Sequence, residues 1–285
     1  MLTRRNFLTA GAGLAGAGIG TTGYAVGVEP SSIKQTRWVP PITNWTLTRP
    51  LRIVAIADVH MSPPFMTLGR LEDIVREANG LLPDIVVLLG DYAEGHGFGL
   101  SRSAPVDVAR VLSGLEAPLG SWAVFGNHDW ATDPAASTSL SGLTVWHEAF
   151  DAAGINVLSN RAARLSHHGE PFWIGGLESQ VVQRDDLDTT LAQMDDAAPA
   201  ILLAHEPDIF PRVPDRISLT LSGHTHGGQV RLFGQAPVVP SRYGSRYAYG
   251  HVVENGRHLI VSAGLGCSRL PVRFGIPPEL VIVDL

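Results

Sequence analysis

Five short apolar runs in this chain are each followed by side chains that can bind a metal ion. The runs are residues 51–57, 84–89, 121–125, 200–204 and 217–221. The polar residues that follow them are Asp58 and His60, Asp91, Asn127, His205, and His224 with His226. Each run has the length and the aliphatic content of a buried strand. Because ligands bind beyond the carboxyl ends of strands in open α/β sheets, we expect these strand ends to meet at one metal site.

The spacing of apolar residues between the runs predicts helices. Residues 67–80 carry apolar side chains at helical intervals, and helices are also expected over residues 105–115 and 146–153. Further strands are predicted at residues 172–174, 229–232, 258–262 and 280–283. Strands that alternate with helices indicate an α/β fold, and the economical arrangement is one domain of two stacked sheets flanked by helices.

The histidines of the last run, His224 and His226, lie two positions apart and precede two glycines. If the strand continues through them, both side chains point to the same face of the sheet. The two rings would then form a pincer for a metal ion, provided that other ligands converge on the same point.

Composition excludes several classes of function. The formal net charge of −6 argues against nucleic acid as the main partner, because phosphate neutralisation needs clustered Lys and Arg. The single cysteine, Cys267, excludes internal disulfides and a Cys-rich zinc site. The 45% hydrophobic content of the 285 residues is enough for a sizeable core.

Residues 1–28 have the composition of a targeting segment. Arg4 and Arg5 precede a Gly- and Ala-rich stretch that carries no charge before Glu29. This pattern resembles a twin-arginine export signal, which implies contact with that export machinery and a location in the periplasm or on the outer face of the cytoplasmic membrane. Cleavage and retention as a membrane anchor both remain open, and the alternative is a disordered start with a chance arginine pair. Residues 29–50 are expected to form a linker or wrapping arm.

The ordered set of strand-end motifs resembles the calcineurin-like metallophosphoesterases. The motifs are Asp58-x-His60, Gly90-Asp91, Gly126-Asn-His-Asp129, His205 and Gly223-His-Thr-His226, and the resemblance covers nearly all of residues 51–285. Segments such as Pro240-Ser-Arg242 and Pro277-Pro-Glu279 resemble a bacterial branch of exported or membrane-associated phosphodiesterases. The resemblance implies one metallophosphoesterase domain over residues 51–285. It also implies a four-layer α/β/β/α sandwich with two mixed sheets and the metal site at the carboxyl ends of the strands.

The resemblance also implies which residues hold two divalent metal ions. Asp58, His60 and His226 would bind the first ion, and Asn127, His205 and His224 the second, with Asp91 bridging both. A mixed nitrogen and oxygen shell suits Mn, Fe, Zn or Co and does not choose among them. The implied reaction is attack of a metal-bridging hydroxide on phosphorus.

Three further residues are expected to assist catalysis. His128 directly follows a ligand, so in an extended segment it points away from that ligand, and we assign it as the proton donor. Glu94 lies three residues after Asp91, where better-known relatives carry an aspartate that orients the catalytic histidine. Asp129 is expected either to support the site from behind or to form a turn.

The substrate is less constrained than the reaction. Those relatives follow the acid with an arginine, where this chain has Gly95-His96, so a phosphoprotein substrate is disfavoured. His96, Arg242 and Arg246 are candidate substrate-binding residues. We expect a phosphodiester of the cell envelope, such as a lipid or a nucleotide-linked sugar. The alternatives are a lipid-precursor pyrophosphatase of the UDP-2,3-diacylglucosamine hydrolase type and a non-enzymatic metal-binding scaffold.

Overall fold

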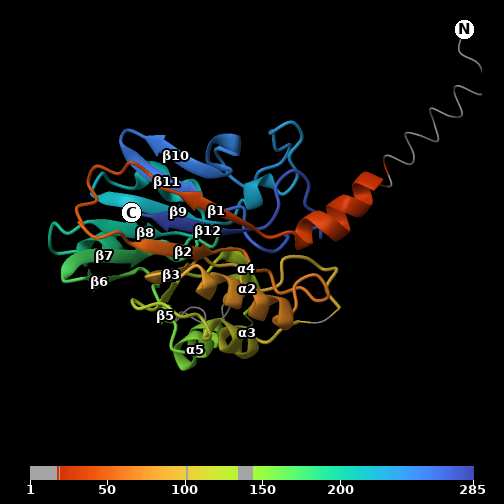
Figure 1. The fold of residues 1–285 in the computed structure, drawn as a ribbon, viewed down its shortest axis with the longest axis horizontal. Helices are drawn as coiled ribbons and strands as arrows, with labels where there is room; N and C mark the ends of the chain where they lie inside the picture. Colours follow the sequence, from red (N-terminus) through yellow and green to blue (C-terminus); the bar gives the residue numbers. More distant parts are fainter. Residues whose placement is uncertain (1–17, 19, 101, 134–143) are drawn as a thin grey trace, which may run out of the picture.

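The computed structural model describes residues 18, 20–100, 102–133 and 144–285, which form two six-stranded sheets packed face to face (Figure 1). The first sheet contains, in spatial order, β1 (Lys34–Trp38), β12 (Glu279–Asp284), β2 (Arg52–Ile56), β3 (Ile85–Leu88), β4 (Ser121–Ala123) and β5 (Asn156–Val157). The second contains β10 (Gly250–Glu254), β11 (Arg257–Val261), β9 (Ile217–Ser222), β8 (Ala200–Leu203), β7 (Glu170–Gly176) and β6 (Arg161–His167).

Both sheets mix parallel and antiparallel pairs. In the first sheet β2, β3, β4 and β5 are parallel, while β12 runs antiparallel to β2. In the second, β7, β8, β9 and β11 are parallel, and β6 and β10 are antiparallel to their neighbours. The prediction of an α/β fold with two mixed sheets is confirmed.

Three clusters of buried hydrophobic residues fill the spaces between the layers of the molecule. Alternate residues of β2 face opposite sides, as the period of a strand requires. Val54 and Ile56 pack with the helices α2 (Leu68–Gly80), α3 (Pro105–Leu112) and α5 (Thr144–Ala152), whereas Ile53 and Ala55 pack between the two sheets. The outer face of the second sheet is covered by α6 (Leu187–Ala192) and the 3₁₀ helix η3 (Pro207–Arg212).

The local sequence explains where the main helix begins. The Thr67 side chain accepts a hydrogen bond from the Arg70 N–H at 3.2 Å and so caps α2, whose buried face is Leu71, Ile74, Val75 and Ala78. The structure closely matches the predicted helix over residues 67–80. It also closely matches the predicted strands that precede Asp58, Asp91 and His205.

Other elements differ from the prediction. Residues 229–232 do not form a strand; Val230 and Leu232 make isolated bridges after a 3₁₀ turn, η4 (His226–Gly228), because two glycines with positive φ turn the chain there. Four strands were missed, namely β1, β5, β6 and β10, and so were the short helices α4 (Asn127–Thr132) and α6. β1 lies within the expected arm, residues 29–50, and its side chains are mostly exposed, so it lacks the apolar pattern of a buried strand.

The N-terminal segment enters the domain beside the loops that follow β2 and β11. Residues 20–23 are helical and continue into a π-helical turn, η1 (Tyr24–Val28), and a 3₁₀ turn, η2 (Glu29–Ser31). In the described parts of the chain, no helix has both the length and the apolarity needed to cross a membrane.

The aromatic cluster beneath the first sheet gives a test of the core. Phe150 on α5 is fully buried, and its ring centroid lies 4.8 Å from that of Tyr92 and 5.2 Å from that of Phe125. We expect Phe150→Ala to lower the free energy of unfolding by about 3–5 kcal/mol, because it leaves a cavity among rigid rings. Urea denaturation measures this. Val145→Ala, at an exposed position of the same helix, should change stability by less than about 0.5 kcal/mol, and equal losses in the two variants would contradict the packing described.

Candidate metal centre

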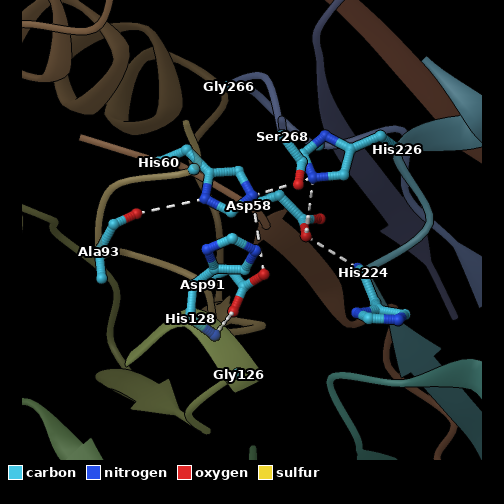
Figure 2. Close-up of polar contacts among 12 residues, drawn as sticks. Asp58, His60, Asp91, Ala93, Gly126, His128, His224, His226, Gly266 and Ser268 are labelled. Atoms are coloured by element: carbon cyan, nitrogen blue, oxygen red, sulfur yellow. Dashed lines mark hydrogen bonds and ion pairs between the residues drawn. The ribbon is translucent and has the colours of Figure 1, made fainter. Parts of the chain in front are cut away.

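Asp58, His60 and His226 form a first cluster of potential ligands (Figure 2). The Nε2 atoms of His60 and His226 face each other at 3.0 Å, and the rings are stacked with centroids 4.9 Å apart. The Nδ1–H of His60 donates to the Ala93 carbonyl at 3.2 Å. In the neutral ring Nε2 then carries no proton, and its lone pair is available to a metal ion. Burial lowers the pKa of His60 to about 3, so the ring is neutral at physiological pH.

Asp91, His205 and His224 form a second cluster. His205 Nε2 lies 3.2 Å from Asp91 Oδ2 and 3.3 Å from His224 Nδ1. The other nitrogen of His205, Nδ1, donates to the Leu89 carbonyl at 2.7 Å and so fixes the ring.

Asp91 lies between the two clusters. Its Oδ2 atom is 3.2 Å from Nε2 of His205 in the second cluster and 3.6 Å from Nε2 of His60 in the first. Although burial opposes its ionisation, the charge of His205 and its hydrogen bond to the carboxylate hold the pKa of Asp91 well below its usual range. A carboxylate in this position can serve an ion on either side.

The buried groups of the site fit divalent cations. The Asp58 Oδ2 and Asn127 Oδ1 atoms are buried and have no hydrogen-bond partner in the described structure. Burial also raises the pKa of Asp58 to about 7, although its Oδ1 atom accepts a hydrogen bond from the His224 N–H at 2.8 Å. Imidazole lone pairs that face one another repel unless a proton or a cation lies between them. A set of imidazoles, carboxylates and one amide oxygen suits transition metals or zinc.

Most of these side chains are presented by strained backbone. Asp58, His60, Asp91, His224 and His226 all have φ between 47° and 69°, the left-handed region that few non-glycine residues adopt. The pincer predicted from strand geometry is therefore wrong: β9 ends at Ser222, and His224 and His226 turn into different clusters. Left-handed residues redirect the chain within one or two positions, which an extended strand cannot do.

Glycines allow the loops to approach the ligands closely. A Cβ atom at Gly126 would lie 2.2 Å from Asp91 Oδ1, and one at Gly264 would lie 2.6 Å from the Asp58 Cβ. Real Cβ atoms do not come this near to other heavy atoms, so a larger residue at either position would displace a ligand. Gly264 also has a φ of 70°, which favours glycine.

Asp129 holds two of the site loops together from behind. Its carboxylate is fully buried and accepts hydrogen bonds of 2.8–2.9 Å from four backbone N–H groups. The donors are Asp91, Tyr92, Ala93 and Gly126. Of the two roles expected from the sequence, this geometry corresponds to support from behind.

His128 lies beside both clusters. Residues Asn127–Thr132 form the short helix α4 rather than an extended segment, so the argument that His128 points directly away from Asn127 is wrong. Its ring packs edge-on against His60 with centroids 4.7 Å apart, and its backbone N–H donates to Asp91 Oδ1 at 2.8 Å. The ring atoms of His60 and His128 and the Asp91 carboxylate are close enough to form a third potential ligand group.

Glu94 orients His128 through its backbone. The Nδ1–H of His128 donates to the Glu94 carbonyl at 3.0 Å, while the Glu94 carboxylate pairs with Arg102 at 2.8 Å. The expectation that the carboxylate would hold the histidine is corrected, because a main-chain oxygen occupies that position.

The three candidate substrate-binding residues have other contacts. His96 is buried between the rings of Phe65 and Phe98 and lines a small cavity that His60 also borders. Arg242 pairs with Asp208 at 3.3 Å. Arg246 makes two hydrogen bonds with Glu254, at 2.7 and 2.8 Å, and lies over Tyr247. Among the described contacts, none joins either arginine to the metal-ligand candidates.

Arg273 is a residue of the site that the sequence reasoning missed. Its guanidinium is fully buried and donates to the carbonyls of Ala263, Gly264, Gly266 and Ile276. Its Nη2 atom also lies 3.3 Å from Nδ1 of His226. Burial lowers the pKa of this arginine. Its one sequence signal is an arginine flanked by Val272 and Phe274, which by itself is weak.

Comparison with known proteins identifies the family. The profile of the calcineurin-like phosphoesterases matches residues 51–228. The chain belongs to this family. It is therefore a metal-dependent phosphoester hydrolase, as the order of its strand-end motifs predicted.

Relatives of this family match over most or all of the chain. The metallophosphoesterase YkuE of Bacillus subtilis is 32% identical, covering 100% of this chain and 98% of its own length. The phosphodiesterase YaeI of Escherichia coli is 30% identical over all of both chains. A metallophosphoesterase of Aquifex aeolicus is 29% identical over 82% of this chain and 85% of its own length.

The position of Asp91 between the clusters leads to a prediction about metal content. We expect Asp91→Ala to lower the metal bound per chain and to abolish turnover, because the carboxylate that contacts both clusters is lost. Elemental analysis of purified protein measures the first effect. Asp73→Ala, on the exposed face of α2, should retain the metal content of the original protein. Full metal occupancy and normal activity in Asp91→Ala would rule out the bridging position.

Proposed function

We propose that this protein is a phosphodiesterase of the cell envelope that uses two divalent metal ions. The observation that carries the proposal is the position of the Asp91 Oδ2 atom, 3.2 and 3.6 Å from imidazole nitrogens of the two separate clusters. One carboxylate can therefore neutralise the repulsion between two neighbouring cations. Asp58, His60 and His226 would hold one ion, and Asn127, His205 and His224 the other.

The ions would supply a water of lowered pKa as nucleophile and would offset charge on the phosphoryl oxygens. The protein fixes the ligands around them. His60 and His205 each donate their outer nitrogen to a backbone carbonyl, which sets the tautomer and directs Nε2 into the site. A donor set of four imidazoles, two carboxylates and an amide favours Mn, Fe, Zn or Co.

His128 is the proton donor of the proposed reaction. The Glu94 carbonyl holds its Nδ1–H, so Nε2 remains for the substrate. A protonated Nε2 can donate to the leaving oxygen as the bond to phosphorus breaks. The half-buried ring beside His60 lies at the edge of the clusters, where a substrate can reach it.

The diester preference is supported by similarity. The Escherichia coli relative that spans the whole chain is named a phosphodiesterase. The substrate class that we propose is a phosphodiester of an envelope lipid or of a nucleotide-linked sugar.

A comparison of soluble chromogenic esters tests the activity and the role of His128. We expect hydrolysis of bis(p-nitrophenyl) phosphate to exceed that of p-nitrophenyl phosphate in protein loaded with Mn²⁺. His128→Ala should retain metal and slow hydrolysis of a diester with an alcohol leaving group by about 10²-fold or more, because proton donation to the leaving oxygen is lost. The loss should be smaller for bis(p-nitrophenyl) phosphate, because nitrophenolate departs without a proton.

The control for this experiment is His168→Ala, at an exposed turn of the β6–β7 hairpin. It should turn over the diester at the original rate. A faster reaction with the monoester would overturn the diesterase proposal, and an unchanged rate in His128→Ala would remove His128 from the mechanism.

The envelope location is supported by the sequence of residues 1–28. The arginine pair, Arg4 and Arg5, lies outside the described residues. We expect the double change Arg4→Lys and Arg5→Lys to keep the protein in the cytoplasm, since the twin-arginine route reads the arginine pair itself. Cell fractionation with immunoblotting measures this, and the single change Arg37→Lys in β1 is the control. Unaltered export of the double variant would reject the export signal.

A further inference from the structure

Exposed apolar side chains gather on the loops around the metal centre. We call five of them the apolar rim: Phe98, Leu100, Leu232, Phe233 and Leu270. The relative exposure of Phe233 is 104%, and that of Leu100 is 85%. Single exposed apolar residues are ordinary, but a contiguous group on a soluble surface marks an interaction site.

Backbone hydrogen bonds show that the rim loops are neighbours. The Arg269 N–H donates to the Gly95 carbonyl at 2.8 Å, which joins the loop of Leu270 to that of Phe98. The Gln229 side chain donates to the Leu270 carbonyl at 2.9 Å, which joins the loop of Leu232 to the same place. The segment between Arg269 and the metal centre includes Gly266, whose N–H donates to the Asp58 carbonyl. The rim therefore borders the ligands.

Two of the rim loops carry arginines and no acidic residue in an otherwise acidic protein. Residues 226–243 and 264–278 contain four arginines and no aspartate or glutamate, although the whole chain has a net charge of −6. Arg231 and Arg269 take part in no ion pair among the described residues, although the Arg231 guanidinium donates to the carbonyls of Gly227 and Gly234. An apolar surface with unpaired arginines is complementary to an anionic lipid headgroup layer.

The N-terminal segment joins the rim from the other side. The Ala25 carbonyl accepts a hydrogen bond from the Arg273 N–H at 2.9 Å, and the Tyr24 ring packs edge-on against Phe274 at 6.3 Å. The Arg231 N–H in turn donates to the Phe274 carbonyl at 2.7 Å. Figure 1 shows the helix that ends at Val28 leaving the molecule on the side of these loops. The chain carries no charged side chain between Arg5 and Glu29.

We infer that the apolar rim is a membrane-binding surface that lays the metal centre against an anionic lipid bilayer. One consequence of the inference rests on the proposed function, namely that the substrate phosphodiester lies at the bilayer surface. The surface itself follows from the exposed apolar residues, the unpaired arginines and the attached uncharged segment.

Amide hydrogen exchange of the full-length, Mn²⁺-loaded protein tests the surface. The probe is vesicles of phosphatidylcholine and phosphatidylglycerol in a 3:1 ratio. We expect exchange to slow by about fivefold or more in residues 96–100, 231–235 and 268–271, and to slow less with phosphatidylcholine alone. The turns at residues 81–84 and 254–256 should exchange at the same rate with and without vesicles.

Matched variants separate the rim from the N-terminal segment. The rim variant combines Leu232→Ser, Phe233→Ser and Leu270→Ser and should lose the protection of its loops. The control combines Val39→Ser and Leu82→Ser, which are also exposed, at 71% and 78%, and lie at the ends of β1 and β3 that are remote from the site. It should keep the protection.

Two outcomes would overturn the inference. One is vesicle binding that protects residues before Glu29 and leaves the rim loops unchanged, and the other is no protection anywhere. Hydrolysis of soluble bis(p-nitrophenyl) phosphate without vesicles is measured in parallel and should be equal in all three proteins. Absence of that activity would reject the proposed function, whereas absence of rim protection in the original protein, with the activity intact, would reject the lipid surface.

Discussion

Nitrogen and oxygen atoms that can bind a metal crowd together inside the protein, and the site depends on how they are satisfied. His60 and His226 bring their Nε2 atoms to 3.0 Å, and Nε2 of His205 lies 3.3 Å from Nδ1 of His224 and 3.2 Å from the buried Asp91 carboxylate. Such groups lose hydration on burial and have few protons to share among them. Divalent cations can satisfy several of these atoms at once.

The sequence predicted which residues form the site better than it predicted the backbone conformation that positions them. Asp58, Asp91 and His205 follow buried parallel strands, so their convergence follows from the rule that such strands end at one edge of a sheet. His224 and His226 do not obey strand geometry, because their left-handed backbone depends on contacts with distant loops. Glu94 contributes its carbonyl rather than its carboxylate, a choice that side-chain chemistry cannot reveal. β1 was missed because an edge strand with exposed side chains has no apolar alternation to recognise.

The left-handed conformation of the ligands has an energetic consequence. A non-glycine residue held in that region costs about 1–3 kcal/mol. Five such residues together approach the whole net stability of an ordinary domain, about 5–15 kcal/mol. Hydrogen bonds to the surrounding loops must therefore offset the strain, and the structure provides two concentrated sources of them. They are the buried side chains of Asp129 and Arg273.

These two side chains are complementary in chemistry and in position. Asp129 can only accept, and it takes four backbone N–H groups from the loops of Asp91 and Gly126. Arg273 can only donate, and it satisfies carbonyls of the loop that packs on Asp58. The backbone N–H of Arg273 also binds the Ala25 carbonyl, and the N–H of Ile276 binds the Glu29 carboxylate at 2.7 Å. Removal of the chain up to Ala25 would break the first of these bonds. Ala25 and Glu29 thus support the loop that Arg273 holds against Asp58.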